Sequence, residues 1–176
     1  RLEGMQSEVT SLDFDGHHVV AGGKEGEVWM WDAHTQEGMM ICKHREPCLS
    51  VQMHEAGSVI SADTAGEVRR STVSKSTVSK SEICAQASQP LGCLQVSDSG
   101  AHAIAGLADG GIVVWTTADF QPIMSFQAHD APVTCVQMVW DDALMQQVLL
   151  TGAADGTVKS WDFNGGKALR TFAGHR

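Results

Sequence analysis

The stretch "GAADGTVKSWDFNGG", from Gly152 to Gly166, ends an apolar–polar alternation in Trp161-Asp162 and carries a second acid at Asp155. Alternating Val, Lys, Ser and Trp between glycine and aspartate are typical of a short, half-buried strand between tight turns. Two carboxylates near an aromatic ring suit either an active site or a structural hydrogen-bond network. The choice depends on whether the stretch is unique in the chain or one copy of a repeat.

The same pattern occurs three more times. Each copy has a glycine, an aliphatic residue two positions later and, three positions further on, a tryptophan or its replacement. The copies are "GEVWMWD" from Gly26, "GEVRRS" from Gly66, "GGIVVW" from Gly110 and "GTVKSWD" from Gly156. Their final positions, Trp31, Ser71, Trp115 and Trp161, are 40, 44 and 46 residues apart. Such spacing is typical of an array of small structural units.

Two further signatures accompany every copy in the same order. The first is "VTSL" at Val9, "CLSV" at Cys48, "LGCL" at Leu91 and "VTCV" at Val133; the second is "HHVVAGG", "GSVISAD", "AHAIAGL" and "QVLLTGA". No segment has a sustained helical period of apolar residues. Each unit therefore predicts about four short antiparallel strands, a sheet that buries both faces only by stacking on others, as in a β-propeller.

These units resemble WD40 repeats. The fourth, "AHDAPVTCVQMVWDDALMQQVLLTGAADGTVKSWDFNGGKALRTF", is similar to the family pattern almost throughout. The third lacks the aspartate after Trp115, and the second departs most, because Arg69, Arg70 and Ser71 replace the expected aliphatic-x-Trp sequence. The resemblance implies an all-β WD40 β-propeller with four blades of four-stranded antiparallel sheets, forming an incomplete ring or part of a larger propeller.

The repeats divide the chain as follows. Residues 1–4 are expected to be the tail (strand d) of a preceding blade, 5–43 repeat 1, 44–88 a degenerate repeat 2, 89–128 repeat 3, 129–172 repeat 4, and 173–176, with Gly174-His175, the start of a further repeat. WD40 rings have about four to eight blades. Three arrangements stay open: a portion of a larger propeller, two chains that join edge to edge into an eight-bladed ring, or a compact four-bladed ring.

The resemblance assigns the acids of the opening stretch to structure. In the family, a histidine before the first strand, a Ser or Thr on the second, an aspartate in the next turn and a tryptophan on the third form one hydrogen-bonded network. By position these are His129, Thr151, Asp155 and Trp161. A buried aspartate needs such partners because its desolvation is costly.

The other units hold incomplete sets. The second keeps His44 and Ser61 but has Ala65 and Ser71 in the other two positions; the third keeps Asp109 and Trp115 with Ala105, and the first keeps Trp31 with Ala21 and Glu25. The fourth blade is therefore expected to be the most rigid by hydrogen bonding, and the second the least regular.

Composition and the motifs present make several classes of function less favoured for this chain. The chain has 176 residues and a net charge of −9, which disfavours nucleic acid and anionic membranes as partners. It has no apolar run of the roughly 18 residues that a membrane helix needs, so no membrane insertion is expected. The five cysteines include no C-x-x-C pair, which favours free thiols in a reducing compartment and an intracellular, cytoplasmic or nuclear location. No catalytic motif, metal spacing or cofactor motif is present, so a protein that is not an enzyme is expected, with no cofactor and no metal.

Three surfaces are candidate contacts. The turns on one face of a WD40 propeller commonly dock proteins; here they carry Lys24, Glu25, Arg45, Glu46, Asp63 and Asp130. The longer hairpin "VWDDALMQQ" offers Trp140 and Met145 as an apolar contact, unless it folds back on its blade. The segment "VRRSTVSKSTVSKSE" holds tandem "STVSK" repeats and four cations, Arg69, Arg70, Lys75 and Lys80.

The basic segment has two interpretations. It is a phosphorylatable contact for an acidic partner, or an outer hairpin whose lysines guard a sheet edge. The favoured function is a non-catalytic WD40 scaffold that binds other proteins within a multiprotein assembly, with self-association through open blade edges. The alternative is an RNA- or ribonucleoprotein-associated propeller that uses Arg69–Lys80; an enzyme with a site in the central channel ranks lower.

Overall fold

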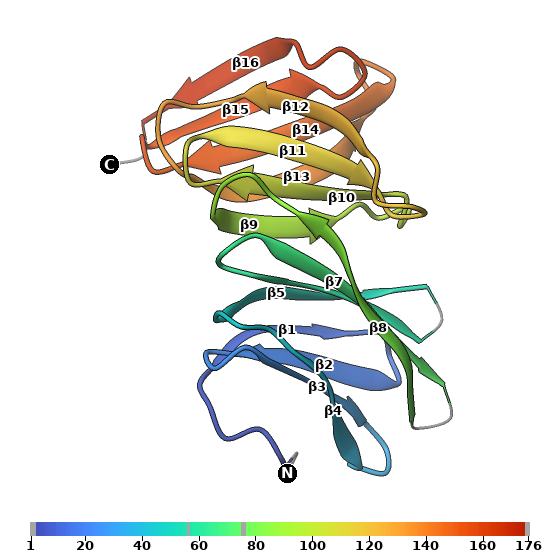
Figure 1. Ribbon diagram of the computed structural model, residues 1–176. Helices are drawn as coiled ribbons and strands as arrows, with labels where there is room; N and C mark the ends of the chain where they lie inside the picture. Colours follow the sequence, from blue (N-terminus) through green and yellow to red (C-terminus); the bar gives the residue numbers. More distant parts are fainter. Residues whose placement is uncertain (1–2, 56, 75–76, 175–176) are drawn as a thin grey trace. The chain divides into compact units, whose positions relative to one another are not determined.

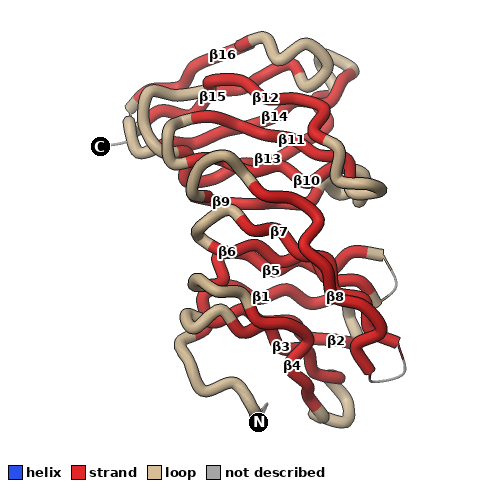
Figure 2. The backbone as a smooth tube through the Cα atoms, viewed as in Figure 1, coloured by secondary structure: helices blue, strands red, loops and turns tan. Residues whose placement is uncertain are grey.

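The computed structural model describes residues 3–55, 57–74 and 77–174. These residues form sixteen strands and no helix (Figures 1 and 2). No helix in this part of the chain is therefore long and apolar enough to span a bilayer. The chain divides into two compact units, Arg1–Ser88 and Gln89–Arg176, each built from two sheets.

The first unit holds two four-stranded antiparallel sheets whose strands follow one another in chain order. The first sheet contains β1 (Val9–Phe14), β2 (His18–Gly23), β3 (Glu27–Asp32) and β4 (Gly38–Lys43). The second contains β5 (Cys48–His54), β6 (Ser58–Asp63), β7 (Glu67–Ser74) and β8 (Thr77–Gln86). Strand β5 contacts β1 and β2, so the two sheets pack on each other.

The second unit repeats this plan. Its first sheet contains β9 (Leu91–Val96), β10 (His102–Leu107), β11 (Gly111–Thr116) and β12 (Pro122–Gln127). Its second contains β13 (Val133–Asp141), β14 (Gln146–Ala153), β15 (Thr157–Asp162) and β16 (Ala168–Ala173). Strand β13 contacts β9 and β10, as β5 contacts β1 and β2. All four sheets are four-stranded and antiparallel, which is the blade of a WD40 propeller.

Each unit has its own apolar core between its sheets. Val20, Val28, Val51 and Val59 are fully or almost fully buried in the first unit. In the second unit the core includes Ile104, Ile112, Val133, Leu149 and Trp161. The second strands are buried almost continuously: all six residues of β6 and five of the six residues of β10 are buried.

A glycine lets the first strand of one blade approach the second strand of the blade before it. A Cβ atom on Gly22 would collide with Cys48 and Val51, and one on Gly106 would collide with Val133 and Cys93. Cys48 and Val133 are the first residues of β5 and β13, and both are buried. In both units, a glycine on the second strand of one blade therefore makes room for the first residue of the next blade's first strand.

Three of the four sheets fall within one sequence repeat, and the fourth ends one residue beyond its repeat, at Ala173. Glu3 and Gly4 form no strand, and the Glu3 carbonyl accepts a hydrogen bond from Trp31 Nε1 at 2.8 Å. Strand β16 ends at Ala173, and Gly174 is irregular. His175, which the sequence places at the start of a further repeat, lies outside the described residues.

Candidate functional sites

The fourth blade contains a network that joins its strands through side chains. His129, just before β13, is buried, and its Nε2 atom lies 2.8 Å from Thr151 Oγ1 on β14. Trp161 on β15 donates its Nε1–H to the same hydroxyl oxygen at 2.9 Å. Because the indole only donates, the Thr151 hydroxyl proton is left for His129 Nε2, which leaves the ring proton on Nδ1.

The other ring nitrogen of His129 reaches the turn between β14 and β15. Its Nδ1 atom lies 3.2 Å from Asp155 Oδ2 and 3.1 Å from Thr157 Oγ1. Hydrogen bonds from the Thr157 hydroxyl and backbone, with His129 beside them, lower the pKa of Asp155 to about 2. The structure thus brings His129, Thr151, Asp155 and Trp161 together, with both imidazole nitrogens occupied and the ring shielded from any substrate. The arrangement can hold a blade rigid. Asp155 differs from the expected buried aspartate, because 27% of its side chain is exposed.

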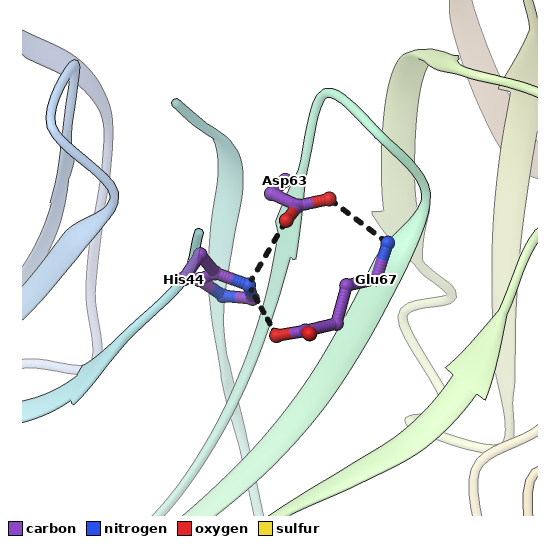
Figure 3. Close-up of side chains that lie close together, drawn as sticks. All are labelled: His44, Asp63 and Glu67. Carbon is purple, nitrogen blue, oxygen red and sulfur yellow. Dashed lines mark hydrogen bonds and ion pairs between the residues drawn. The ribbon is translucent and has the colours of Figure 1, made fainter. Parts of the chain in front are cut away.

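The second blade holds a different cluster around its histidine (Figure 3). His44, just before β5, places Nε2 at 2.8 Å from Ser61 Oγ on β6, as in the fourth blade. Its Nδ1 atom lies 3.1 Å from Glu67 Oε1 and 3.8 Å from Asp63 Oδ2. Asp63 ends β6 and Glu67 begins β7, so the turn between these strands supplies both acids.

The placement of Asp63 differs from the expectation that it lies on a docking rim. Its exposed fraction is 1%, and its Oδ1 atom accepts the backbone N–H groups of Ala65 at 3.0 Å and Glu67 at 2.9 Å. When the repeats are aligned, Ala65 stands at the position of Asp155, and the alanine side chain cannot accept a hydrogen bond. The sequence feature that indicates the cluster is the pair of acids in "DTAGE": Asp63 stands two residues before Ala65, and Glu67 stands two residues after it.

The charges around His44 do not balance if its ring is neutral. Burial is the main cause that lowers the pKa of His44, against the opposing effect of the Asp63 and Glu67 carboxylates. Arg69 Nε donates to Glu67 Oε1 at 2.6 Å. Two formal carboxylate charges thus face one guanidinium in a place where solvent barely reaches.

The second blade lacks the tryptophan of the network, and the first blade keeps the tryptophan but lacks the hydroxyl that would accept its hydrogen bond. Ser71 occupies the tryptophan position of the second blade and pairs with Ser81 Oγ at 2.9 Å. The β7–β8 ladder has two register shifts, at Val68/Arg69 and Thr72/Val73, where the other third-to-fourth strand ladders have one each. In the first blade Trp31 finds Ala21 where a hydroxyl would be, and bonds the Glu3 carbonyl instead.

The remaining rim residues are exposed. Lys24 and Glu25 lie between β2 and β3, Arg45 and Glu46 between β4 and β5, and Asp130 between β12 and β13. In the first unit, His44 N–H donates to the Gly26 carbonyl at 2.9 Å, so the β2–β3 turn lies against the β4–β5 connection. Four of the expected rim residues are thereby gathered on one edge of that unit. Lys24 is paired with Glu8 at 3.0 Å.

The β13–β14 hairpin projects apolar side chains into solvent. Trp140 is 57% exposed and Met145 is 72% exposed, and Leu144 is also exposed. Met145 has a φ of 52°, a left-handed conformation that is unusual for a bulky side chain. The hairpin tip therefore does not fold back onto its blade.

Acidic side chains pair with some of the cations of the basic segment and reduce its net positive charge. Arg69 pairs with Glu67, and Lys80 Nζ lies 2.8 Å from Glu82 Oε2. Arg70 faces Glu82 across the β7–β8 ladder. Lys75 lies outside the described residues.

The five cysteines, all in the described part of the chain, are free thiols. Burial raises the pKa of Cys48 and of Cys93 to about 12 in each case, which keeps both thiols protonated and inert. Cys135 is exposed.

Comparison with known proteins identifies the class to which these blades belong. The family model "WD domain, G-beta repeat" matches residues 1–32 and 120–162. The four sheets and the network of the fourth blade agree with that match, so the chain is similar to WD40-repeat proteins in both sequence and fold.

Individual relatives are more distant. The chain is 25% identical over 172 residues to "Non-functional target of rapamycin complex subunit LST8-2" of Arabidopsis thaliana, which covers 93% of this chain and 54% of that protein. It is 37% identical over 68 residues to the human "Peroxisomal targeting signal 2 receptor", which covers 38% of this chain and 20% of the receptor. The chain thus spans about half the length of the first of these relatives. The crystal structure of the computationally designed Ika4 protein superposes with a TM-score of 0.75 at 26% identity, covering 92% of this chain and 95% of the designed one.

Proposed function

We propose that this chain is part of a non-catalytic WD40 scaffold that binds other proteins within a multiprotein assembly. The observation that carries the proposal is the exposed apolar tip of the β13–β14 hairpin, held on the blade that has the complete side-chain network. Exposed large apolar groups on a rigid support are typical of protein-binding surfaces. The names of two relatives, a complex subunit that is itself called non-functional and a receptor for a targeting signal, support a binding role.

Exposed charged residues of the first unit also support a protein-binding role. Glu25, Arg45 and Glu46 are exposed and of mixed sign, which suits selection among protein partners more than attraction of a polyanion. Free thiols throughout the described chain support a reducing, intracellular location in the cytoplasm or nucleus. The histidines of the two networks, His44 and His129, are both buried, which supports a binding role.

A photo-crosslinking amino acid at position 140, introduced into the protein in cells, tests the proposal. We expect discrete crosslinked products at position 140. The matched control is position 98, an exposed aspartate in the β9–β10 turn of the same unit. Products that are identical at both positions, or absent at position 140, would contradict docking through the hairpin.

Self-association is a second interaction proposed for this chain, through the open face of the fourth blade. A hollow of about 220 Å³ there is lined by Cys135, Val136, Leu150, Gly152 and Val158, among others. Gly152 aligns with Gly106, whose missing side chain makes room for Val133. The hollow therefore suits the apolar first strand of another WD40 blade, in a second copy or elsewhere in a longer chain.

RNA binding by Arg69–Lys80 stays the alternative, although acids pair with two of its cations. Replacement of Arg69, Arg70, Lys75 and Lys80 by alanine would abolish a steeply salt-dependent RNA affinity if this alternative held. Absent or salt-insensitive binding would contradict it.

A further inference from the structure

We propose that His44, Asp63 and Glu67 form a buried binding site for one divalent transition-metal cation, of which Zn²⁺ is the best match. His44 Nδ1 and one carboxylate oxygen from each acid all lie within 4.8 Å of one another. Ligands at about 2.0–2.2 Å from a tetrahedral zinc ion are separated from one another by about 3.3–3.5 Å. The 3.1 Å and 3.8 Å separations from His44 Nδ1 to the two acids bracket that range.

The ring nitrogen at the centre of the cluster is the second observation that points to a ligand. His44 Nδ1 is fully buried and faces two carboxylate oxygens, at 3.1 Å and 3.8 Å, without a well-aligned hydrogen bond to either of them. Figure 3 shows this nitrogen facing both carboxylates. A buried nitrogen that forms no directed hydrogen bond to such a close oxygen fits a pair of atoms that share a cation.

The fourth blade shows that the fold does not need two acids here. There a single carboxylate, Asp155, serves the histidine, and Thr157 stands at the position of Glu67. In the second blade both acids are buried, which is costly without a compensating positive charge. A dication bound by the two carboxylates supplies that charge.

Two of the proposed ligands are also held from behind, as metal ligands are. Ser61 Oγ lies 2.8 Å from the far nitrogen of His44, and the Ala65 and Glu67 backbone N–H groups bond the far oxygen of Asp63. The third differs, because Arg69 Nε donates to Glu67 Oε1, the oxygen that faces His44, at 2.6 Å. Such outer contacts fix the tautomer and orientation of ligands in metal sites. One imidazole nitrogen and two carboxylate oxygens favour Zn²⁺, with Co²⁺ as a spectroscopic substitute.

The test measures metal binding by the untagged, chelator-treated 176-residue chain. Calorimetric titration with Zn²⁺ is expected to give one equivalent per chain, and Co²⁺ is expected to give the visible absorption of a low-symmetry site. Glu67→Gln and Asp63→Asn are expected to abolish the binding.

Two controls separate the site from the fold. Asp155→Asn alters the corresponding network of the fourth blade and is expected to leave the stoichiometry and the Co²⁺ spectrum unchanged. The far-ultraviolet circular dichroism of metal-free Glu67→Gln reports whether that variant keeps its strands. Absence of stoichiometric Zn²⁺ binding by the wild-type chain, or binding by a folded Glu67→Gln variant equal to wild type, would overturn the proposal.

Discussion

Trp161 and His129 are hydrogen-bonded to the same hydroxyl group, that of Thr151, at 2.9 Å and 2.8 Å. One small side chain on β14 thereby connects the third strand of the blade to the segment that precedes its first strand. Trp161 also packs against Phe126 of the neighbouring sheet, with ring centroids 4.8 Å apart. The residue therefore stabilises its own blade by hydrogen bonding and the second unit by burial.

Replacement of Trp161 by alanine is expected to destabilise the second unit by about 3–5 kcal/mol, the usual range for truncation of a buried aromatic side chain. The lost packing leaves a cavity, and the Thr151 hydroxyl loses a donor. Chemical denaturation followed by circular dichroism measures the change. Trp140→Ala is the matched control, because Trp140 is exposed and its loss is expected to change the free energy of unfolding by less than about 0.5 kcal/mol. Equal stability of the two variants would contradict burial of Trp161.

The carboxylate of Asp155 is expected to give the second unit an acid-dependent stability. Its folded pKa of about 2 lies below the ordinary value of 3.8, so its contribution is fully present above that ordinary value and is lost as the pH falls toward 2. The measurement is the free energy of unfolding across this pH window in wild type and Asp155→Asn. A flatter pH dependence is expected for the variant. An exposed control, Asp130→Asn, should retain the wild-type slope.

Thiol reactivity should rank the cysteines by exposure. At pH 8, a thiol with a pKa of about 12 is ionised in only about one molecule in ten thousand, so Cys48 and Cys93 are expected to resist alkylation while the chain is folded. Cys135 is expected to react first. Mass spectrometry of peptides after brief treatment with iodoacetamide gives the order. Early labelling of Cys48 in folded protein would show that the first unit opens readily.

Val158→Lys is expected to reduce self-association without unfolding the chain. Val158 lines the hollow of the fourth blade and is already partly exposed, so the lysine places a charge where an apolar strand would dock. Light scattering at several concentrations measures the change in average mass. Ile123→Lys introduces the same charge at another exposed position of the unit. A mass reduced equally by both variants would indicate general repulsion in place of a specific contact.

Much of the fold could be predicted because the repeat is a local pattern. The spacing of Trp31, Ser71, Trp115 and Trp161 indicates four similar sheets, and these form with the strands in chain order. The His129–Thr151–Asp155–Trp161 group could be predicted for the same reason, since each member occupies its motif position. A hydrogen-bond network whose members all occupy motif positions can be predicted from an alignment of the repeats alone.

The cluster of the second blade could not be predicted in that way. Alignment compares single positions, whereas His44 is reached by acids displaced by two residues from the usual place, and a displacement of two keeps a side chain on the same face of a strand. The position of Asp63 beside the turn between the second and third strands predicts a place on the docking rim, whereas the structure buries it. The exposure of Trp140 was equally beyond the sequence, because an apolar hairpin tip has no periodicity that separates packing from projection.

The recurring contact between a second-strand glycine and the first residue of the following blade has a consequence for how such chains change. Gly22 with Cys48 and Gly106 with Val133 are the same joint made from different residues. This contact needs only a glycine on one blade and a small or branched residue on the next blade. It therefore does little to distinguish one pair of blades from another. Gain or loss of a whole two-blade unit by recombination therefore keeps this contact intact within each unit, and the number of blades can change while the geometry of these two contacts stays the same.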